Sequence, residues 1–251
     1  MEQNICEAVL TNVAGAINVT KAALAGGAKH FVFISTDKAV DPDNVMGATK
    51  RLAEIAISRL VEDSGMSVAM VRFGNVLGSS GSVVPLFEKQ ILEGGPVTLT
   101  HEDVTRYFMT VEEASSLVLQ AAALHGSDGS AGLYVLDMGE PILIRQLAET
   151  MIRMKGKVPD HDIMIETTGL RPGEKMHEVL TYASEGVTPT SVSGVLRVSG
   201  KHARGKLFDK QLLALIEAAH QRKRTETLRL LMQLVPEYRK LLEQDQAANI
   251  A

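Results

Sequence analysis

The chain is poor in the residues that mark disulfide-bonded, secreted or membrane-spanning proteins. Its 251 residues include one cysteine, Cys6, and no tryptophan. A single cysteine excludes an intramolecular disulfide and favours a reducing compartment, so we expect a cytoplasmic protein. No run of about 18 apolar residues occurs, and the first residues lack the basic start and apolar core of a signal peptide. We therefore expect no membrane segment in this chain.

Charge of one sign is also scarce. The formal net charge is -4, and the densest basic cluster is the short run Arg222–Arg224. This balance argues against nucleic acid as a partner. With 45% hydrophobic and 22% charged residues, the composition is that of an ordinary globular protein long enough for two compact units.

A glycine-rich turn between a strand and a helix is missing as well. Rossmann units receive a pyrophosphate at such a turn, on backbone N–H groups and at the positive end of the helix. G-x-G-x-x-G does not occur, and the one G-x-x-G-x-x-G, at 126–132, leads toward the apolar run at 133–136 rather than following a strand. The glycine pairs Gly78 with Gly81 and Gly169 with Gly173 do not join a strand to a helix either. If the chain holds a Rossmann unit, we expect only its carboxyl-terminal part.

Chemically useful side chains gather after one apolar strand. Residues 31–34 form a continuous apolar run, typical of a parallel strand buried on both faces, and the polar residues 35–38 follow at its carboxyl end. Open α/β sheets hold ligands beyond such strand ends. A turn and a helix over about residues 47–61 come next. Met46 and Lys50 lie four positions apart, so they share a face and can look back at residues 35–38.

These residues resemble the active site of the extended short-chain dehydrogenase/reductases, where a Ser or Thr at a strand end is followed by Tyr-x-x-x-Lys. The strings Ser-Thr-Asp-Lys-Ala at 35–39 and Met-Gly-Ala-Thr-Lys-Arg at 46–51 are similar to the nucleotide-sugar 4,6-dehydratases of bacterial surface-polysaccharide biosynthesis, including the branch with Met in the Tyr position. The resemblance covers about residues 3–182. In isolation, Met46 would read as a core filler and Lys50 as a solvated helix charge.

The resemblance implies five catalytic residues. Thr36 would hydrogen-bond the C4 oxygen of the sugar, Asp37 would donate a proton to the departing C6 hydroxyl, and Lys38 would remove the C5 proton. Lys50 would hold the nicotinamide ribose of NAD, which is implied rather than NADP. Met46 can neither donate nor accept the C4 hydroxyl proton, so Thr36, a water molecule or Lys50 would have to relay it.

Later motifs resemble the family's binding residues. The strand at 68–73 leads into Arg-x-x-Asn-x-x-Gly, and the loop Gly-Leu-Arg-Pro-Gly-Glu-Lys covers 169–175. The planar fork of an arginine matches phosphate oxygens. A UDP-sugar, of the UDP-N-acetylhexosamine type, is the implied substrate, and no metal is expected. The implied cofactor-binding residues are Lys50, Arg72 and Gly74, and the implied substrate-binding residues are Asn75, Val84, Pro85, Arg106, Arg171 and Glu174.

The expected fold is α/β, with the carboxyl-terminal half of a Rossmann-type doubly wound parallel sheet and a smaller α/β substrate-binding domain. We expect residues 1–80 to form a partial NAD-binding domain, 81–183 a nucleotide-sugar region interleaved with it, and 184–251 a helical extension. The strand at 30–35 would be the fifth in the order 3-2-1-4-5-6 and would keep an unpaired edge. We therefore expect a homo-oligomer that alone neither binds NAD tightly nor turns over substrate.

Three functions stay open. The first is a nucleotide-sugar 4,6-dehydratase or its catalytic remnant, and the second is an epimerase on the same scaffold, which needs no acid for a C6 leaving group. The third is a non-catalytic subunit that binds a nucleotide-sugar or a homologous chain. Asp37 and Lys38 favour the dehydratase, and the missing glycine-rich turn favours the subunit. A membrane anchor in longer relatives would lie in a segment absent from this chain.

Overall fold

The computed structural model describes most of the chain, namely residues 1–79, 81–124, 131–199 and 206–238. The chain divides into two compact units, both assembled from separate segments. The first unit comprises Met1–Phe73, Leu117–Asp137 and Val179–Ala251, and the second Gly74–Ser116 and Met138–Glu178. The interleaving is therefore more extensive than the expected boundaries at 80 and 183 imply, because the chain crosses between the units four times.

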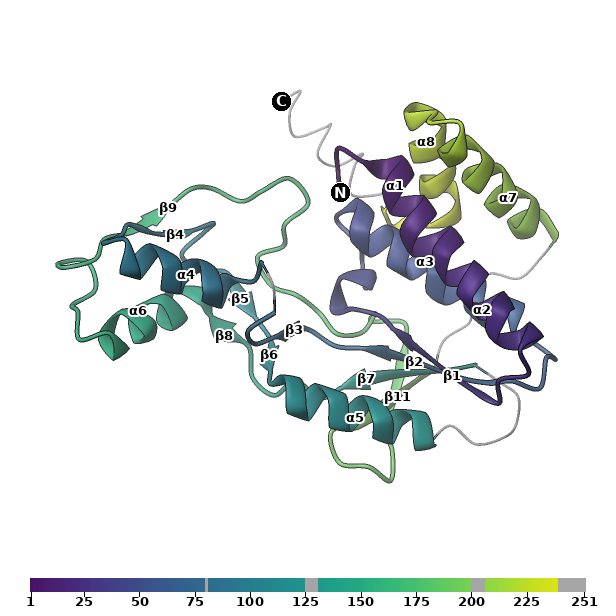
Figure 1. The fold of residues 1–251 in the computed structure, drawn as a ribbon, viewed down its shortest axis with the longest axis horizontal. Helices are drawn as coiled ribbons and strands as arrows, with labels where there is room; N and C mark the ends of the chain where they lie inside the picture. The colour runs from purple at the N-terminus through teal and green to yellow at the C-terminus, as the bar shows by residue number, and fades with distance from the viewer. Residues whose placement is uncertain (80, 125–130, 200–205, 239–251) are drawn as a thin grey trace. The chain divides into compact units, whose positions relative to one another are not determined.

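The first unit is built on a five-stranded sheet with the order β1-β2-β7-β11-β10 (Figure 1). Its strands are β1 His30–Ile34, β2 Ser67–Arg72, β7 Ala131–Leu136, β10 Gly186–Pro189 and β11 Val195–Ser199. The first three run parallel, with Phe31 opposite Val68 and Met70 opposite Leu133. β2 is buried along its whole length, as expected for an inner parallel strand. The predicted α/β class with a parallel sheet is confirmed.

β1 lies at the edge of this sheet, next to β2. Its central residues, Phe31 to Phe33, are only partly buried, and Ile34 is 44% exposed. The expectation that this strand is buried on both faces is therefore wrong. An apolar run identifies a strand whose two faces can both be buried. Whether they are buried depends on which other strands and helices pack against it, and the run does not determine that.

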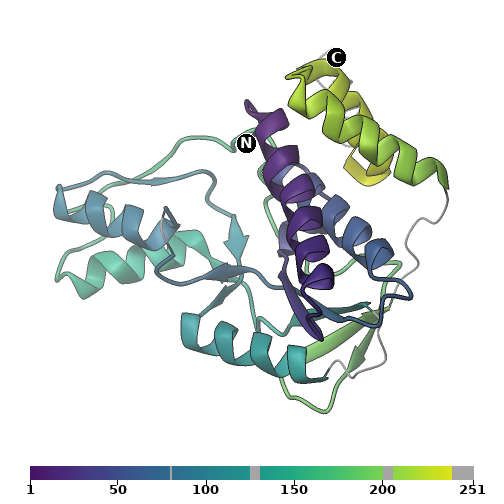
Figure 2. The same ribbon diagram turned by 45° about the vertical axis from the view of Figure 1, so that its right-hand side comes forward.

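Four helical stretches of the first unit, whose ribbons Figure 2 shows, contribute residues to one hydrophobic core. Residues 5–25 form one continuous helical stretch, made of α1 Ile5–Val9, a π-helical turn Leu10–Ala14 and α2 Gly15–Ala25. The other helices are α3 Val45–Leu60, α7 Lys206–His220 and α8 Arg224–Leu234. Apolar residues from all of them, including Val9, Leu52, Leu215 and Leu231, are fully buried in this core.

The stretch Ile5–Ala25 also qualifies, by length and hydropathy alone, as a candidate membrane span. Its sequence is not an uninterrupted apolar run, because polar residues such as Asn12 and Thr20 divide it. Ile5, Val9 and Val13 are at most 2% exposed in the shared core. Core helices of soluble proteins pass the same test, so the finding is one weak candidate.

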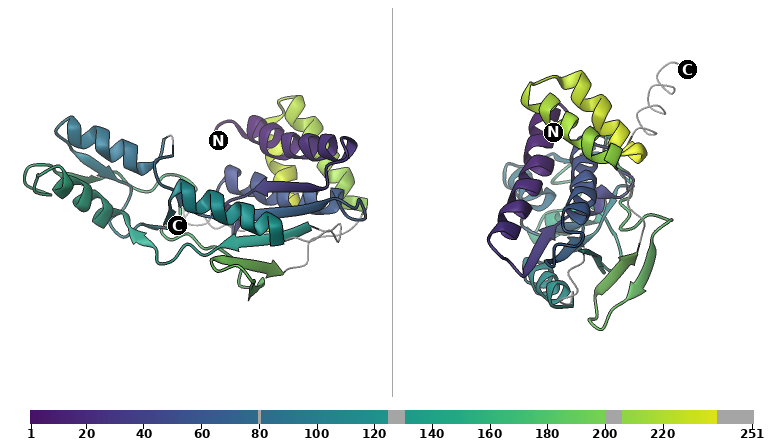
Figure 3. Two further views of the ribbon diagram at one scale, coloured as in Figure 1. Left: turned by 60° about the horizontal axis from the view of Figure 1, so that its bottom comes forward. Right: turned by 90° about the vertical axis from the view of Figure 1, so that its right-hand side faces the viewer.

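The segment after residue 184 departs from the expected helical extension. β10 and β11 form an antiparallel hairpin, and β11 pairs with β7 in the central sheet (Figure 3). The inner positions Val195 and Val198 are buried, so the hairpin contributes to the core. The expectation of helices was right for α7 and α8, whose apolar stripes have helical spacing, and wrong for residues 186–199. Residues 200–205 and 239–251 lie outside the described part of the chain.

The second unit contains three small two-stranded sheets and two helices that share a core around Phe87, Leu99 and Ile152. The strand pairs are β3 Asn75–Val76 with β6 Phe108–Met109, β4 Val97–Leu99 with β9 Ile165–Thr167, and β5 Thr105–Arg106 with β8 Ile142–Leu143. The helices are α4 Val83–Leu92 and α6 Ile144–Met154. A further helix, α5 Val111–Leu124, starts in the second unit and ends in the first.

Candidate functional site

Three of the five predicted catalytic residues, Thr36, Asp37 and Lys38, lie on a short segment after β1, residues 35–40, here called the shelf. Its centre, Asp37–Ala39, is a single 3-10 turn with Thr36 at the N-cap. The Thr36 hydroxyl oxygen accepts a hydrogen bond from the backbone N–H of Lys38 at 3.4 Å and donates one to Oδ1 of Asp37 at 2.9 Å. The backbone N–H of Asp37 donates to the carbonyl of Phe73 at 3.1 Å, which anchors the turn beyond the end of β2.

Asp37 is buried but incompletely satisfied. Its side chain is 1% exposed, and Nζ of Lys38 lies 3.0 Å from Oδ1. The second oxygen, Oδ2, is buried without a hydrogen-bond partner among the described residues. Buried polar atoms nearly always have partners, so an orphan atom is typical of a catalytic or ligand-binding position. Thr36, Asp37 and Lys38 thus lie together in one hydrogen-bonded turn, and their catalytic role stays a prediction.

Helix α3 approaches the shelf closely because of one glycine. The side chain of Asn44 caps the helix by accepting a hydrogen bond from the backbone N–H of Gly47 at 2.8 Å. A Cβ atom at Gly47 would lie 2.0 Å from the carbonyl oxygen of Lys38, so no other residue fits there without displacement. The close contact places the first turn of α3, which carries Met46, directly against the shelf.

Lys50 reaches back from α3 to the end of β1. Its Nζ donates to the carbonyl of Ile34 at 2.6 Å and lies 4.2 Å from the centre of the Phe33 ring. Burial lowers the pKa of Lys50, and the negative charge of Glu54 opposes part of that shift. Met46, one turn earlier, is half-buried. The predicted common face of Met46 and Lys50 therefore adjoins the strand end and the shelf.

Arg72, predicted to bind the cofactor, instead belongs to a buried group of charges. This group, here called the ion cluster, consists of Arg51, Glu54, Arg72 and Glu185. Nη2 of Arg72 donates to Glu54 Oε2 at 2.7 Å, Nη1 donates to Glu185 Oε2 at 2.8 Å, and the residue is 0% exposed. Its guanidinium is thus engaged inside the unit, which corrects the expected role of its side chain.

The ion cluster also sets the charge state of Glu54. Burial by itself would raise the pKa of this carboxyl, but the charge and hydrogen bonds of Arg72, the charge of Arg51 and the hydrogen bond from Ser35 outweigh it, so the pKa is lowered. Glu54 therefore stays ionised although it is fully buried. Sequence reasoning missed Glu54 and Glu185. A glutamate among the inward residues of an apolar helix, with an arginine ending the next strand, was the available signal.

Arg106 and Glu174, predicted to bind substrate, meet in the second unit. Nη2 of Arg106 donates to Oε1 of Glu174 at 3.0 Å, and the same oxygen accepts a hydrogen bond from Thr100 at 2.9 Å. The backbone N–H of Arg171 donates to the other Glu174 oxygen at 3.2 Å, and Arg171 itself is exposed. Glu174 therefore links the loop at 169–175 to β5, and the convergence of Arg106 and Arg171 on a diphosphate stays a prediction.

The other predicted binding residues also lie in the second unit. Asn75 is half-buried on β3, and its backbone N–H donates to the carbonyl of Tyr107 at 3.1 Å. The backbone N–H of Gly74 faces the sulfur of Met138 at 3.5 Å. Val84 and Pro85 lie in the first turn of α4, where Pro is tolerated because the first helical N–H groups have no partner within the helix. Each of the four holds a strand-end or helix-start position.

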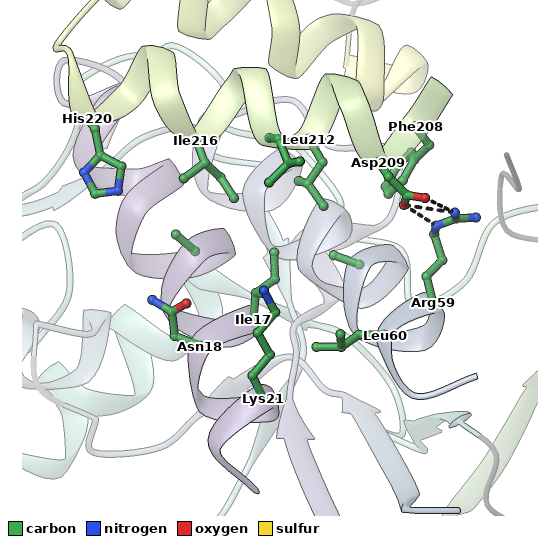
Figure 4. A pocket seen from close by; sticks show the side chains of 13 residues that line it. Ile17, Asn18, Lys21, Arg59, Leu60, Phe208, Asp209, Leu212, Ile216 and His220 are labelled. Atoms are coloured by element: carbon green, nitrogen blue, oxygen red, sulfur yellow. Dashed lines mark hydrogen bonds and ion pairs between the residues drawn. The ribbon is translucent and has the colours of Figure 1, made fainter. Parts of the chain in front are cut away.

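A separate cavity of about 530 Å³ lies between α2, α3 and α7 in the first unit (Figure 4). Apolar side chains such as Ile17, Leu212 and Ile216 line most of it, and the ion pair of Arg59 with Asp209 lies at one side. None of the predicted catalytic or binding residues line this cavity. Across the described residues, no group of His, Cys, Asp and Glu side chains could hold a metal ion.

Fold and site together define a class. A parallel α/β sheet with Thr-Asp-Lys after one strand and a lysine on the following helix is the arrangement of the extended short-chain dehydrogenase/reductases. Within that class, the chain belongs to the polysaccharide biosynthesis protein family, whose model matches residues 1–200.

Individual relatives agree with this assignment. The capsular polysaccharide biosynthesis protein CapD of Staphylococcus aureus is 56% identical over 186 residues, which cover 74% of this chain and 30% of that protein. A UDP-glucose 4-epimerase of Rickettsia akari is 33% identical, over 76% of this chain and 55% of the relative. The X-ray structure of Pen from Bacillus thuringiensis superposes with a TM-score of 0.71 at 36% identity, over 81% of this chain and 62% of that one. The chain thus spans less than two thirds of each relative.

Proposed function

We propose that the chain carries the catalytic and nucleotide-sugar-binding residues of an NAD-dependent, cytoplasmic UDP-sugar 4,6-dehydratase in surface-polysaccharide biosynthesis. The family membership supports a nucleotide-sugar enzyme, and the dehydratase reaction is the finer step that we propose. One observation carries it, the buried Asp37 with its orphan Oδ2 beside Lys38.

The proposed reaction needs an acid and a base on neighbouring carbons of the sugar. Asp37 in its protonated form would donate from its carboxyl oxygen to the departing C6 hydroxyl, and Lys38 in its neutral form would remove the C5 proton. The two groups are adjacent in sequence and 3.0 Å apart, so one sugar can meet both. An epimerase needs no acid at C6, which makes this pair the feature that separates the two reactions.

The chain's residues fit the nicotinamide end of NAD. Lys50 offers an amine at the strand end, where burial lowers its pKa, and would hold the ribose hydroxyls. NAD, when bound, would supply the hydride acceptor for C4 and the donor for C6. Thr36 would hydrogen-bond the C4 oxygen. Because Met46 cannot donate or accept the C4 hydroxyl proton, we assign the transfer of that proton to a relay through Thr36, a water molecule or Lys50.

For the substrate, we propose that the diphosphate of a UDP-sugar binds at Arg106 and at the loop that carries Arg171. The Glu174 carboxylate accepts hydrogen bonds from the Arg106 guanidinium and from the Arg171 backbone N–H. Glu174 would therefore orient this loop, and it would also contact the ribose of the substrate. Arg171→Ala should weaken UDP-sugar binding by about 1.5–3 kcal/mol, the range for hydrogen bonds to charged groups. Titration calorimetry measures this, and unchanged affinity would remove Arg171 from the site.

The reaction itself can be tested in a chimaera in which this chain replaces the matching 186 residues of the Staphylococcus aureus relative. Incubation with NAD and UDP-N-acetylglucosamine should give a product lighter by one water, detected by mass spectrometry. Asp37→Asn and Lys38→Met should each lower turnover by about 10²–10⁴-fold while UDP-sugar binding persists. A product of unchanged mass with inverted C4 would establish the epimerase reaction instead, the activity named for the Rickettsia relative.

We further propose that this chain self-associates through β1. This strand is the edge strand of the sheet and pairs with β2 on one side, so its other side faces away from the sheet. Exposed strand edges with apolar faces pair readily with other chains. Light scattering of the purified chain should report a dimer or larger species, and replacing Val32 with lysine should shift it toward the monomer. A concentration-independent monomer in the unmodified chain would contradict this assembly.

A further inference from the structure

The shelf is held at both ends by side chains that the proposed reaction does not use. At its start, the hydroxyl of Ser35 donates to Oε1 of Glu54 at 2.6 Å. At its end, the hydroxyl of Tyr182 donates to the carbonyl of Ala39 at 2.8 Å. Asp37 and Lys38 lie between these two anchors. The position of the Asp37 carboxyl therefore depends on residues far away in the sequence.

Tyr182 and Glu185 form one turn that joins the second anchor to the ion cluster. The backbone N–H of Glu185 donates to the carbonyl of Tyr182 at 3.0 Å, and the backbone N–H of Tyr182 donates to Oε2 of Glu185 at 3.0 Å. The Glu185 carboxylate also accepts two hydrogen bonds from Nη1 of Arg72, at 3.1 and 2.8 Å. The Tyr182 ring lies 4.9 Å from the guanidinium carbon of Arg51. The Tyr182 hydroxyl and the Glu185 carboxylate are thus both engaged in the interior.

Burial makes the contacts within the ion cluster costly to break. Arg51, Arg72, Glu54 and Glu185 balance two positive and two negative charges, and their side chains are between 0 and 9% exposed. Water cannot replace a contact broken in this interior, so each displaced group would be left with an unpaired charge. A turn fixed in this way transmits its position to Ala39 through a single hydrogen bond from Tyr182.

We infer that Tyr182 and Glu185 are positioning residues for the shelf. They hold the Asp37–Ala39 turn so that Oδ2 of Asp37 stays buried and Nζ of Lys38 stays beside Oδ1. The inference rests on the proposed function only for the identity of the reaction that this geometry serves. Its structural content, that the turn at 182–185 sets the geometry of the shelf, applies to the chain by itself.

The test uses the full chain and the variant Tyr182→Phe, which keeps the ring against Arg51 and removes only the hydroxyl. Amide hydrogen exchange at residues 37–40 should accelerate about fivefold or more, the factor expected for the loss of one net hydrogen bond. The matched control is Tyr238→Phe, since Tyr238 is another buried tyrosine, on the helical side of the core. This control should leave exchange at residues 37–40 unchanged.

The rate at which a reagent acylates Lys38, measured relative to an exposed lysine, is a second readout. A general change in the stability of the chain does not alter this ratio. In Tyr182→Phe, Lys38 should be acylated faster relative to the exposed Lys89, because the shelf no longer holds its amine against Asp37. Glu185→Gln, which keeps the shape of the side chain and removes its charge, should change exchange at 37–40 in the same direction. Failure of the dehydration test in the chimaera would not alter either readout, so the two ideas fail separately.

Two results would overturn the inference. One is exchange and acylation in Tyr182→Phe that match the unmodified chain. The other is acceleration of exchange by the same factor throughout the first unit, which would assign Tyr182 to overall stability.

Discussion

Two buried carboxylates, Glu54 in the ion cluster and Asp37 on the shelf, are equally hidden from solvent but differ in how many of their oxygen atoms have hydrogen-bond partners. Glu54 is 0% exposed and receives hydrogen bonds from Ser35, Arg51 and Arg72. Asp37 is 1% exposed, yet one of its oxygens has no partner in the described structure. A saturated carboxylate has nothing left to offer a ligand. An unsaturated one keeps an oxygen atom without a partner, at a cost in stability, and that oxygen is the one our proposal assigns to the substrate.

Substitutions in the ion cluster and on the shelf should therefore change different quantities. Breaking a saturated buried ion pair leaves an uncompensated charge, which costs about 3–5 kcal/mol. Neutralising Asp37, in which only Oδ1 has partners, removes a desolvated charge together with one ion pair, so we expect a smaller change in stability than in the ion cluster and a larger change in turnover. Stability measurements should thus single out the ion cluster, and activity measurements the shelf.

The largest effect is expected for Arg72→Met. This change leaves both Glu54 and Glu185 without their main partner in the interior, so the free energy of unfolding should fall by about 3–5 kcal/mol in denaturant titration. The control is Arg59→Met, which breaks the more exposed pair with Asp209 and should cost at most about 1 kcal/mol. If both variants lose the same amount, the contrast between buried and exposed pairs fails.

A smaller loss is expected where α3 touches the shelf. Gly47→Ala places a Cβ atom 2.0 Å from the Lys38 carbonyl oxygen, so the helix start or the shelf must move, at about 1–3 kcal/mol. Gly15→Ala is the matched control, because its nearest contact would be 3.5 Å and the residue is helical. That variant should gain about 0.5–1 kcal/mol, as a helical glycine replaced by alanine does. A stable Gly47→Ala variant would show that the shelf is pliable.

The shelf and the ion cluster also differ in how much of each could be predicted from the sequence. The strand-end position of Thr36, Asp37 and Lys38 followed from an apolar run that ends abruptly, because strand polarity is a local signal. The roles of Arg72 and Glu185 did not follow, since their pairing joins positions 113 residues apart and depends on the tertiary fold. An arginine at a strand end looks the same in sequence whether it faces a ligand or two carboxylates.

The hairpin of β10 and β11 was missed for a related reason. Gly186–Pro189 is exposed, and its two central residues, Val187 and Thr188, give no alternation that marks a buried face. Its pairing is determined by β11, whose buried residues meet β7. By contrast, α3 was predicted to within two residues at each end, because its helical periodicity is encoded locally.

Met46 gives the next prediction in size. A half-buried methionine that serves only to fill space beside the shelf should tolerate leucine, with a change in unfolding free energy below about 1.5 kcal/mol. Turnover of the chimaera should stay within a few-fold, since the sulfur has no proton to give or take. Met46→Leu tests the sulfur alone, and loss of turnover at unchanged stability would give the thioether a chemical role that its position does not suggest.

The smallest effect concerns Lys50, whose charge lies between the two regions. Burial lowers its pKa below the ordinary value of 10.5, so the folded chain releases this proton at a lower pH than the unfolded chain does. Below the folded pKa, the desolvated ammonium weakens the fold; as pH rises through the folded pKa toward 10.5, that penalty disappears. The unfolding free energy of the unmodified chain should therefore rise relative to Lys50→Met between neutral and alkaline pH. Because Lys50 is only partly buried, the change should stay below about 1 kcal/mol. Parallel denaturant titrations of the two proteins measure it, with Lys21→Met as the exposed control. A difference that moves in the opposite direction would mean that the Ile34 carbonyl and the Phe33 ring stabilise the ammonium more than burial penalises it.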